Sequence, residues 1–460
     1  MRAGSLKPVA ESGKYKAYSE YKDSGVEWFG SIPSHWQVAG FKKYLSSIVD
    51  YRGKTPNKTD SGILLVTARN IKQGQLDYEK SQEFIDPDDY ESVMIRGKPE
   101  IGDVLFTTEA PLGEVAIVDR TDFALAQRII KFSGMKSILD NYYFRYLLMS
   151  QEFQQSLQMY ASGSTALGIK AERFVYLRKL LPPYSEQRII ANFLDHETAK
   201  IDTLIEEQQS LIRLLQEKRQ AVISHTVTKG LNPDAPMKDS GVEWLGEVPE
   251  HWVVRRLKHA SDHQSGIPKG KDLTGRKTIE VPMLRVANVQ DGYLDLTDVH
   301  TIKIEPSQLD RFMLKKGDVL MNEGGDNDKL GRGAVWTGEI NPCIHQNHVH
   351  AIRPREIEPE WLELLTGSSY AKFHFYRVAK QSTNLASISS SSMKETPLVI
   401  PPVEERREIM SYLKKMKTNY DSLETECQKQ ITLLSEHRTA LISAAVTGKI
   451  DVRDWTAPKE

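Results

Sequence analysis

The sequence predicts an α+β protein: two similar globular domains separated by a pair of long antiparallel coiled-coil helices, with pseudo-two-fold symmetry. Three observations lead to this prediction. The segment KDSGVEWFGSIPSHWQV at 22–38 is identical at twelve of seventeen positions to KDSGVEWLGEVPEHWVV at 238–254. Strand-like segments follow each copy in the same order. After each set of strands, the apolar residues change to a helical spacing.

The composition is that of a globular protein too long for one hydrophobic core. The chain has 460 residues, 39% of them hydrophobic and 27% charged, with a net charge of −1, so we expect at least two domains. The sequence contains no apolar segment long enough to cross a membrane, and its first residues do not form a secretory signal. Two cysteines suit a reducing compartment. We therefore expect a cytoplasmic protein that contacts any nucleic acid through local patches.

The repeat sets the predicted domain boundaries. They are an N-terminal segment at 1–21, a first globular domain at 22–184, a first long helix at 185–230, a second globular domain at 231–403, a second long helix at 404–450 and a C-terminal tail at 451–460. Each globular domain ends at a Pro-Pro pair, in LLPPYSEQR and VIPPVEERR, where proline stops the preceding element just before a helix.

Within each globular domain, the sequence predicts paired strands at corresponding places. The segments LLVTARNIKQGQLD at 64–77 and MLRVANVQDGYLD at 283–295 both indicate a strand, a polar turn and a return. GDVLFTTEAPLGEVAIV and GDVLMNEGGDNDKLGRGAVW indicate a turn and a hairpin, with a longer loop in the second copy. The residues that this comparison aligns are Asn70 with Asn288, Gln127 with Gln346, and Ser164-Thr165 with Ser382-Thr383.

The two predicted helices carry matching apolar seams. The first comprises Leu194, Thr198, Ile201, Ile205, Gln208, Ile212, Leu215, Arg219 and Val222, with Leu204 and Leu211 expected to widen it. The second comprises Leu413, Lys417, Tyr420, Glu424, Cys427, Ile431, Leu434, Arg438 and Leu441. A lone helix would leave its seam in water, so the helices should pair. Because a helix of about 40 residues is about 60 Å long, the second must run back antiparallel to reach the first.

These doubled motifs resemble the specificity subunit of type I restriction-modification enzymes. The residues that carry the resemblance are the doubled KDSGVEW and GDVL, the helix starts PPYSEQR and PPVEERR, and the helix ends AVISHTVTKG and ALISAAVTGK. The resemblance covers nearly the whole chain from Lys22 to about Val452. It implies a non-catalytic subunit in which each globular domain is a target recognition domain. Each would read one half of an asymmetric bipartite site in double-stranded DNA, and the helix pair would set the gap and dock the methyltransferase subunits.

The resemblance also implies the partners and their cofactors. The expected partners are double-stranded DNA, two modification (methyltransferase) subunits and restriction/translocase subunits. S-adenosylmethionine, ATP and Mg would belong to these partner subunits. We expect no cofactor, metal or catalytic residue in this chain, and no membrane contact.

Candidate DNA-binding residues are the polar and cationic side chains of the predicted loops, because Arg, Lys, Asn and Gln read base edges and Ser and Thr hold phosphates. In the first domain they are Arg52, Lys54, Asn57, Lys58, Arg69, Asn70, Thr107, Thr108, Ser164, Thr165 and Lys170. In the second they are Lys269, Lys271, Arg276, Arg285, Asn288, Asn322, Lys329, Arg332, Gln346, Ser382, Thr383 and Asn384. A solvated loop residue is an equally good interpretation of each.

Residues shared by both copies cannot by themselves explain two different half-sites. Asn70 with Asn288, and Gln127 with Gln346, are therefore also candidates for a structural role. The loop of unequal length after GDVL is a better candidate for discrimination. The four tryptophans of the repeated segments, Trp28, Trp36, Trp244 and Trp252, are expected to pack each segment against its domain or helix base.

Catalytic and metal-binding alternatives have less support. LPPY at 181–184 is similar to the Asn/Asp-Pro-Pro-Tyr motif of adenine methyltransferases, but it lacks the amide or carboxylate that must accept hydrogen bonds from the target amine. Cys343, His345, His348 and His350 have zinc-binding side chains, but their alternation along one strand divides them between two faces. The remaining alternatives are a protein-interaction scaffold that does not bind DNA, and a stand-alone DNA methyltransferase or nuclease.

Overall fold

The computed structural model describes residues 15–53, 56–163, 167–268, 270, 273–325, 330–381 and 386–458. The chain divides into two compact units. Unit 1 comprises Met1–Gln209 and Gln428–Glu460, and unit 2 comprises Ser210–Cys427. Within the described ranges, no helix is both long enough and apolar enough to span a bilayer.

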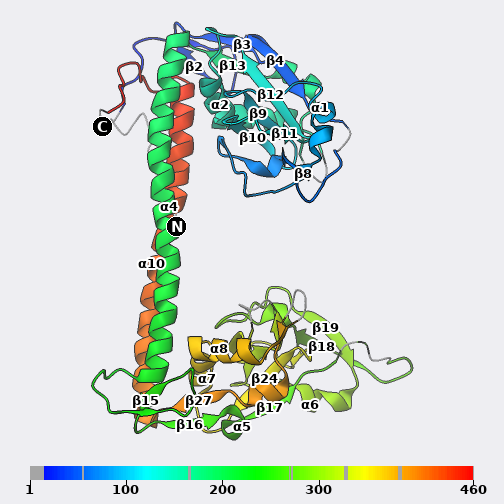
Figure 1. Ribbon diagram of the computed structural model, residues 1–460, viewed down its shortest axis with the longest axis vertical. Helices are drawn as coiled ribbons and strands as arrows, with labels where there is room; N and C mark the ends of the chain where they lie inside the picture. Colours follow the sequence, from blue (N-terminus) through cyan, green and yellow to red (C-terminus); the bar gives the residue numbers. More distant parts are fainter. Residues whose placement is uncertain are drawn as a thin grey trace. The chain divides into compact units, whose positions relative to one another are not determined.

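Unit 1 contains two small sheets (Figure 1), whose buried residues form part of its core. The larger sheet has the strand order β10-β9-β12-β4 and the smaller has β11-β5-β8. Their bounds are β4 (Leu45–Asp50), β5 (Ile63–Val66), β8 (Phe84–Ile85), β9 (Val104–Thr108), β10 (Leu112–Ile117), β11 (Phe123–Leu125) and β12 (Ile129–Gly134). β-Branched and aromatic residues, which favour strands, supply the buried positions. Phe41, Phe132 and Phe174 pack their rings together over the larger sheet.

The remaining elements of unit 1 surround these sheets. The strands are β1 (Tyr21–Asp23), β2 (Ser31–Pro33), β3 (Gln37–Gly40), β6 (Ile71–Lys72), β7 (Gln75–Leu76) and β13 (Arg178–Leu181), and the helices are α1 (Tyr90–Val93), α2 (Asn141–Met149), α3 (Gln151–Tyr160), η2 (Ala68–Asn70), η3 (Pro87–Asp89) and η4 (Ala171–Tyr176). The Asp140 carboxylate caps α2 and the Ser150 hydroxyl caps α3, because each accepts hydrogen bonds from otherwise unpaired backbone N–H groups.

Unit 2 repeats this topology. Its larger sheet has the order β22-β20-β24-β17 and one of its smaller sheets has β19-β18-β23. The strands are β14 (Met237–Asp239), β15 (Glu247–Pro249), β16 (Val253–Arg256), β17 (Ser261–Ser265), β18 (Ile279–Leu284), β19 (His300–Ile304), β20 (Val319–Asn322), β21 (Gly324–Gly325), β22 (Gly333–Val335), β23 (Ile344–His345), β24 (Val349–Pro354), β25 (Lys380–Gln381), β26 (Ala386–Ser387) and β27 (Pro397–Ile400). The helices are α5 (Leu257–Ala260), α6 (Leu309–Phe312), α7 (Pro359–Thr366), α8 (Ser369–Val378), α9 (Ser390–Lys394), η5 (Val286–Asn288) and η6 (Pro306–Gln308). The shared strand order confirms the internal repeat and the α+β class.

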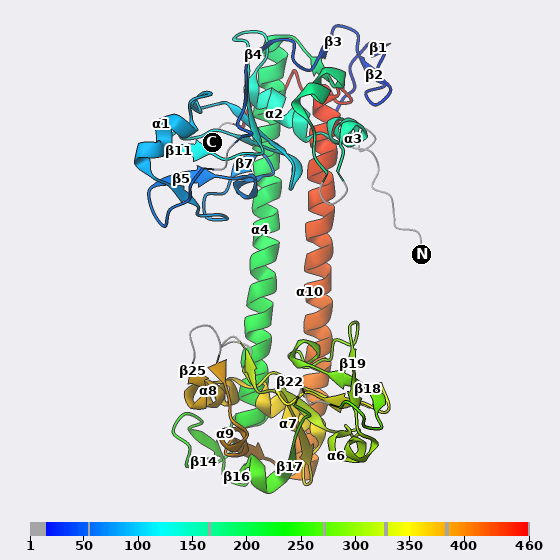
Figure 2. The same ribbon diagram turned by 90° about the vertical axis from the view of Figure 1, so that its right-hand side faces the viewer.

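Two long helices complete the chain, α4 (Tyr184–Lys229) and α10 (Val403–Val446). Within each unit, part of α4 lies beside part of α10 (Figures 1 and 2). In unit 1, Arg438 Nε of α10 lies 2.8 Å from Asp202 Oδ1 of α4, and in unit 2, Arg219 of α4 lies 2.8 Å from Asp421 of α10. The early part of each helix therefore packs against the late part of the other, which is the predicted antiparallel pairing.

The burial of the helix residues follows the predicted seams. Leu194, Thr198 and Ile201 are buried on α4, and the later seam residues are half-buried. The buried seam residues of α10 are Leu413, Tyr420, Cys427 and Leu441, whereas Glu424, Ile431, Leu434 and Arg438 are half-buried and Lys417 is exposed. The expected widening of the first seam is wrong, because Leu204 and Leu211 are 44% and 42% exposed. Two paired helices cover only a narrow stripe of each surface. The pseudo-two-fold arrangement of the two units stays a prediction.

Each repeated segment attaches to the first turn of a long helix. The indole of Trp36 is fully buried and hydrogen-bonds to Glu186 of α4, and the indole of Trp252 is fully buried and hydrogen-bonds to Glu405 of α10. The predicted packing of Trp36 and Trp252 against the helix bases is confirmed. Trp28 and Trp244 are half-buried and pack against the cores of their own units.

Candidate nucleic-acid interface

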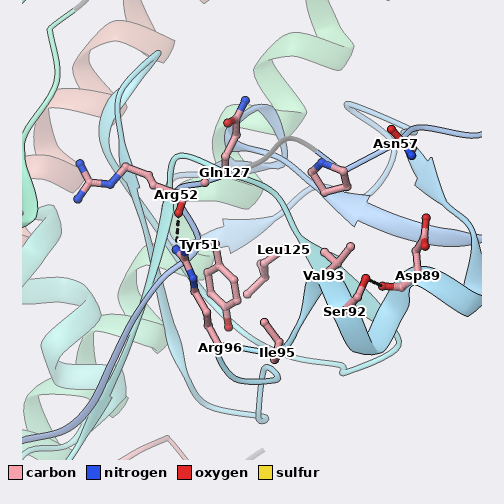
Figure 3. A pocket seen from close by; sticks show the side chains of 12 residues that line it. Tyr51, Arg52, Asn57, Asp89, Ser92, Val93, Ile95, Arg96, Leu125 and Gln127 are labelled. Carbon is pink, nitrogen blue, oxygen red and sulfur yellow. Dashed lines mark hydrogen bonds between the residues drawn. The ribbon is translucent and has the colours of Figure 1, made fainter.

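Unit 1 carries two adjoining recesses lined by candidate DNA-binding residues. The first is lined by Arg52 and Asn57, with Gln127 beside them (Figure 3). The second is lined by Lys58 and Arg69, and Gln127 borders this recess as well. Four residues that the sequence predicts as DNA contacts therefore lie together on one part of the surface.

The parallel pairing of β5 and β11 explains why these side chains converge. Leu125 of β11 lies opposite Val66 of β5 in this pair. The carboxyl ends of parallel strands meet at the same edge of a sheet, so the segments that follow Val66 and Leu125 leave the sheet side by side. The first of these segments carries Arg69 and the second carries Gln127. The chain between β4 and β5 supplies Arg52, Asn57 and Lys58 to the same edge.

The cations at this edge differ in how tightly they are held. Arg52 Nε donates hydrogen bonds of 3.0 and 2.9 Å to the two carboxylate oxygens of Asp50. Burial would raise the pKa of Asp50, but the bonds and charge of Arg52 hold that pKa below its ordinary value. Lys58 pairs with Glu83 at 2.7 Å. In the described part of the chain, the exposed Arg69 guanidinium has no hydrogen-bond or ion-pair partner, so it is available to a ligand.

Asn70 and Asn288 are not available to DNA through their side chains, which corrects the sequence prediction for both. Each is buried, at 0% and 3% exposed. Asn70 Oδ1 accepts from the backbone N–H of Thr67 at 2.9 Å, and Asn70 Nδ2 donates to two backbone carbonyls. Asn288 makes the same three bonds, the first of them from the backbone N–H of Arg285 at 2.8 Å. Both asparagines therefore cap a turn, which is the structural role that their recurrence suggested.

Three further candidates are also buried, which corrects their assignment as surface contacts. Thr107 and Thr108 are 0% and 1% exposed on β9, and their hydroxyls bond to the backbone of neighbouring segments. Asn322 of β20 is 3% exposed, and its amide donates to the carbonyl of Val289 at 2.9 Å. Their polar atoms stabilise the sheet edges. The sequence could not show this, because polar residues at a strand end are common both in cores and in loops.

In unit 2, the candidates around the equivalent sheet edge are partly engaged in ion pairs. Arg285 follows β18 and Gln346 follows β23, and these two strands are parallel, as in unit 1. The Arg285 guanidinium pairs with Asp298 at 2.8 Å. Arg276 pairs with Glu305 at 2.6 Å and is exposed. Arg332 is half-buried, and its guanidinium lies 3.4 Å from the amide oxygen of Gln290.

Some candidates cannot be placed. Lys54, Ser164, Thr165, Lys269, Lys271, Lys329, Ser382, Thr383 and Asn384 lie outside the described residues. Lys170 is described: it is exposed at the start of η4 and lines neither recess of unit 1.

The strand register corrects one sequence alignment. Leu125 lies opposite Val66, and His345 lies opposite Leu284 in the same type of pair. The next backbone N–H groups, of Ala126 and Gln346, donate to Val66 and Leu284 respectively. Gln346 therefore corresponds to Ala126. The residue of unit 2 that corresponds to Gln127 is the next one, Asn347.

Two residues at the edge of unit 1 were missed by the sequence reasoning. Arg96 lines the first recess and Arg128 the second. Arg96 lies in the connection that follows α1, far in sequence from Arg52 and Gln127 of the same recess. Arg128 adopts a left-handed backbone conformation with φ of 77°, which is uncommon for a residue other than glycine. No local sequence signal predicts either placement.

The histidines considered as zinc ligands lie in the core of unit 2 or on its surface. His345 and His350 are buried, whereas His348 is exposed and pairs with Glu323 at 2.8 Å. Among the described residues, no three His, Cys, Asp or Glu side chains are placed to share a metal ion. Burial raises the pKa of the Cys343 thiol to about 12, so this cysteine stays protonated.

Comparison with known proteins places this fold in a family. The family model for the type I restriction modification DNA specificity domain matches the chain twice, at residues 43–213 and 249–433. The EcoKI specificity subunit of Escherichia coli K12 is 23% identical over 455 residues, which covers 93% of this chain and 92% of the relative. The StySPI specificity subunit of Salmonella potsdam is 22% identical, with the same coverage of both chains.

A solved structure shows the same fold. It comes from work on complex assembly and conformational transition of the type I R-M system, and it matches with a TM-score of 0.65 at 17% identity. The match covers 90% of this chain and 98% of the other. Because both halves of the sequence match the family model, the chain belongs to the type I restriction modification DNA specificity family, and it is a specificity subunit.

Proposed function

We propose that the globular part of each unit reads one half of an asymmetric bipartite site in double-stranded DNA. The observation that carries this proposal is the doubled specificity domain, in which one strand order is repeated with different side chains at the edge where the parallel strands end. A shared scaffold with unequal edges is what two unequal half-sites require, because sequence is read by side chains at base edges rather than by the fold.

The charge of the edge in unit 1 supports DNA as its ligand. Basic side chains line both recesses, namely Arg52, Lys58, Arg69, Arg96 and Arg128. Arg52, Lys58 and Arg128 are paired with Asp50, Glu83 and Glu109. Among the described residues Arg69 and Arg96 form no ion pair, so these two supply the positive charge of this patch that is left for a ligand. Such a patch favours contact with the phosphate backbone, and the amides of Asn57 and Gln127 beside it can hydrogen-bond to base edges.

We further propose that the α4–α10 pair sets the gap between the half-sites and docks two modification subunits. In this proposal the modification subunits bring S-adenosylmethionine, and restriction/translocase subunits use ATP and Mg. The support is family membership, since the named relatives are subunits of type I restriction enzymes. Recognition is then the contribution of this chain, and the chemistry belongs to the other subunits.

Sequencing of methylated adenines in cells that express this chain with its modification subunits tests the proposal. We expect one bipartite, asymmetric motif. The double variant Lys58→Ala/Arg69→Ala should weaken DNA binding of the purified complex and lessen its dependence on salt concentration, because fewer phosphate contacts release fewer counterions. The matched control is Lys136→Ala, an exposed lysine that lines neither recess. Binding without any sequence preference would refute the proposal and favour a non-specific scaffold.

Two chimeras separate the roles of the domains and the helices. Replacing residues 57–171 by the equivalent segment of another family member should change one half-site only, and a change in both would contradict the division between units. Inserting the same fraction of a heptad into α4 and α10 should alter the gap and leave both half-sites as they were. An unaltered gap would remove the spacing role of the helix pair.

A further inference from the structure

At the edge of each unit, two consecutive residues occupy corresponding places in the strand register. In unit 1 these are Gln127 and Arg128, and in unit 2 they are Asn347 and His348. The backbone N–H of Thr108 donates to the carbonyl of Arg128 at 2.8 Å. The same bond in unit 2 joins the backbone N–H of Glu323 to the carbonyl of His348 at 2.9 Å.

We propose that this dipeptide, Gln127-Arg128 in unit 1 and Asn347-His348 in unit 2, reads base edges and makes the two half-sites different. The inference rests on the proposed function and assigns the discrimination within it to particular residues. Both dipeptides come shortly after a strand that pairs in parallel with its neighbour. In each, the carbonyl of the second residue accepts the backbone hydrogen bond described above. The backbones differ at the second residue, because Arg128 has a φ of 77° and His348 is not among the described residues with a positive φ. A difference in what the dipeptides contact therefore comes from their side chains together with this local difference in backbone.

The first residue of the dipeptide in unit 1 is placed between two recesses. Gln127 is half-buried and borders both of them, and Figure 3 shows its amide directed away from the pocket-lining Leu125. Within the described ranges its amide makes no hydrogen bond. A glutamine amide can both donate and accept, which matches the N6 and N7 edge of adenine. Asn347 has the same amide on a side chain one methylene shorter, so it reaches less far from the same backbone.

The second residue is held by a carboxylate in both units. Arg128 Nε lies 2.7 Å from Glu109 Oε1, and His348 Nδ1 lies 2.8 Å from Glu323 Oε2. Glu109 directly follows β9 and Glu323 directly follows β20, but the strand register aligns Glu323 with Thr108, so the two carboxylates come from positions one residue apart. This contact engages one nitrogen and orients the side chain, while Arg128 and His348 stay 48% and 56% exposed. The remaining guanidinium nitrogens of Arg128 can then donate to a base, whereas Nε2 of a His348 ring whose Nδ1–H donates to Glu323 can accept from one.

The two side chains suit different bases. The guanidinium of Arg128 is always charged and presents parallel N–H donors, which fit the O6 and N7 acceptors of guanine. The imidazole of His348 offers one further nitrogen, without a second parallel donor. We therefore expect unit 1 to require guanine at the position that Arg128 reads, and unit 2 to show a weaker or different preference at the corresponding position.

Reciprocal exchanges test the proposal. The variant Gln127→Asn/Arg128→His, expressed with the modification subunits, should lose the preference at one or two adjacent positions of one half-site by about 10- to 100-fold. The other half-site should not change. Asn347→Gln/His348→Arg should alter the other half-site alone. Lys136→Ala is again the control, and the thermal midpoint of each variant shows whether its fold is intact.

Arg128→Lys separates base reading from simple attraction to phosphate. Lysine keeps the charge but not the parallel donors, so affinity for random duplexes should stay within a few-fold while the preference at the affected position relaxes. Half-sites that persist in both exchange variants would overturn this inference and leave the proposed function standing. A wild-type complex without any sequence preference would instead refute the proposed function itself.

Discussion

The indole Nε1 of Trp36 donates a hydrogen bond to Glu186 Oε1 at 3.0 Å from a fully buried position. His35 Nε2 lies 2.8 Å from the other carboxylate oxygen of Glu186. Glu186 is in the first turn of α4, where a negative charge is favoured by the unpaired backbone N–H groups and the helix dipole. The repeated His-Trp therefore fixes the start of each long helix on its globular domain, and this explains why the segment occurs twice.

Replacing Trp36 by phenylalanine should destabilise unit 1 by about 1.5–3 kcal/mol, the usual contribution of a hydrogen bond to a charged group. Most of the ring packing is retained, so the loss reports on the bond to Glu186. Trp28→Phe is the matched control, because the buried Nε1 of Trp28 has no hydrogen-bond partner among the described residues. Urea unfolding followed by circular dichroism measures both. Equal losses in the two variants would contradict the role of the hydrogen bond.

Gly448 lies two residues after the end of α10 and beside Trp36, and a side chain there should be poorly tolerated. Its φ is 73°, and an added Cβ would lie 2.4 Å from Cδ of Pro33. Gly448→Ala should cost roughly 1–2 kcal/mol for the left-handed backbone and about 1–3 kcal/mol more for the close contact. The equivalent Gly230→Ala has the same backbone strain, but its nearest atom is Cζ2 of Trp252 at 3.2 Å. Thermal unfolding should therefore show a larger loss for Gly448→Ala than for Gly230→Ala.

The two arginines that interrupt the apolar seams should differ in what they contribute. The side chains of the Arg438–Asp202 pair are 11% and 30% exposed, whereas those of the Arg219–Asp421 pair are 27% and 52% exposed. An exposed ion pair contributes about 0–1 kcal/mol to stability. Removing one partner of a fully buried pair costs about 3–5 kcal/mol, and the cost for the partly buried Arg438–Asp202 pair should lie below that range. Arg438→Ala should therefore destabilise unit 1 by more than Arg219→Ala destabilises unit 2. Hydrogen exchange of peptides from each unit measures this, and equal effects would contradict it.

The sequence predicted the repeat, the long helices and their seams because these features repeat at a regular spacing. Trp36 and Leu194 belong to patterns that recur after a fixed interval, and the structure buries both. Glu186 could not be identified as the partner of Trp36, since the two residues are 150 positions apart. Such contacts depend on the tertiary fold.

The candidate interface was only partly predictable for the same reason. Arg52 and Arg69 lie in polar connecting segments and line adjoining recesses, whereas Asn70 and Thr107 are also polar but are buried. Residue type does not distinguish a side chain that caps a turn from one that faces solvent. The error in aligning Gln127 with Gln346 arose because identical letters were matched, while strand pairing fixes the true correspondence.

Three histidines in unit 2 occupy places where unit 1 has apolar side chains. His345 and His350 are buried, and the His350 ring lies 4.7 Å from that of His263. Burial lowers the pKa of His350 to about 3 and that of His263 to about 4, and the positive charge of Lys394 further lowers the latter. Burial lowers the pKa of His345 as well. Of the charged groups near it, Asp318 raises this pKa and Arg353 lowers it.

Mild acid should therefore weaken unit 2. In the unfolded chain these histidines bind protons near their ordinary pKa of about 6.5. In the folded unit they bind protons only at a lower pH, because their pKa values are lowered. The free energy of unfolding therefore falls as the pH drops below about 6.5. At pH 5 the loss for a deeply buried histidine such as His350 is about 2 kcal/mol.

Hydrogen exchange at pH 7.5 and 5.0, corrected for the intrinsic rate, measures this difference between the units. Peptides that contain β24 should lose protection at pH 5.0, while peptides that contain β12 should keep theirs. Strand pairing places Ile130 of unit 1 opposite Phe106 and His350 of unit 2 opposite Met321, at equivalent positions of the two sheets. His350→Ile therefore gives unit 2 the side chain of unit 1 and should reduce the acid sensitivity of β24. An unchanged pH dependence in this variant would show that the buried histidines are not its source.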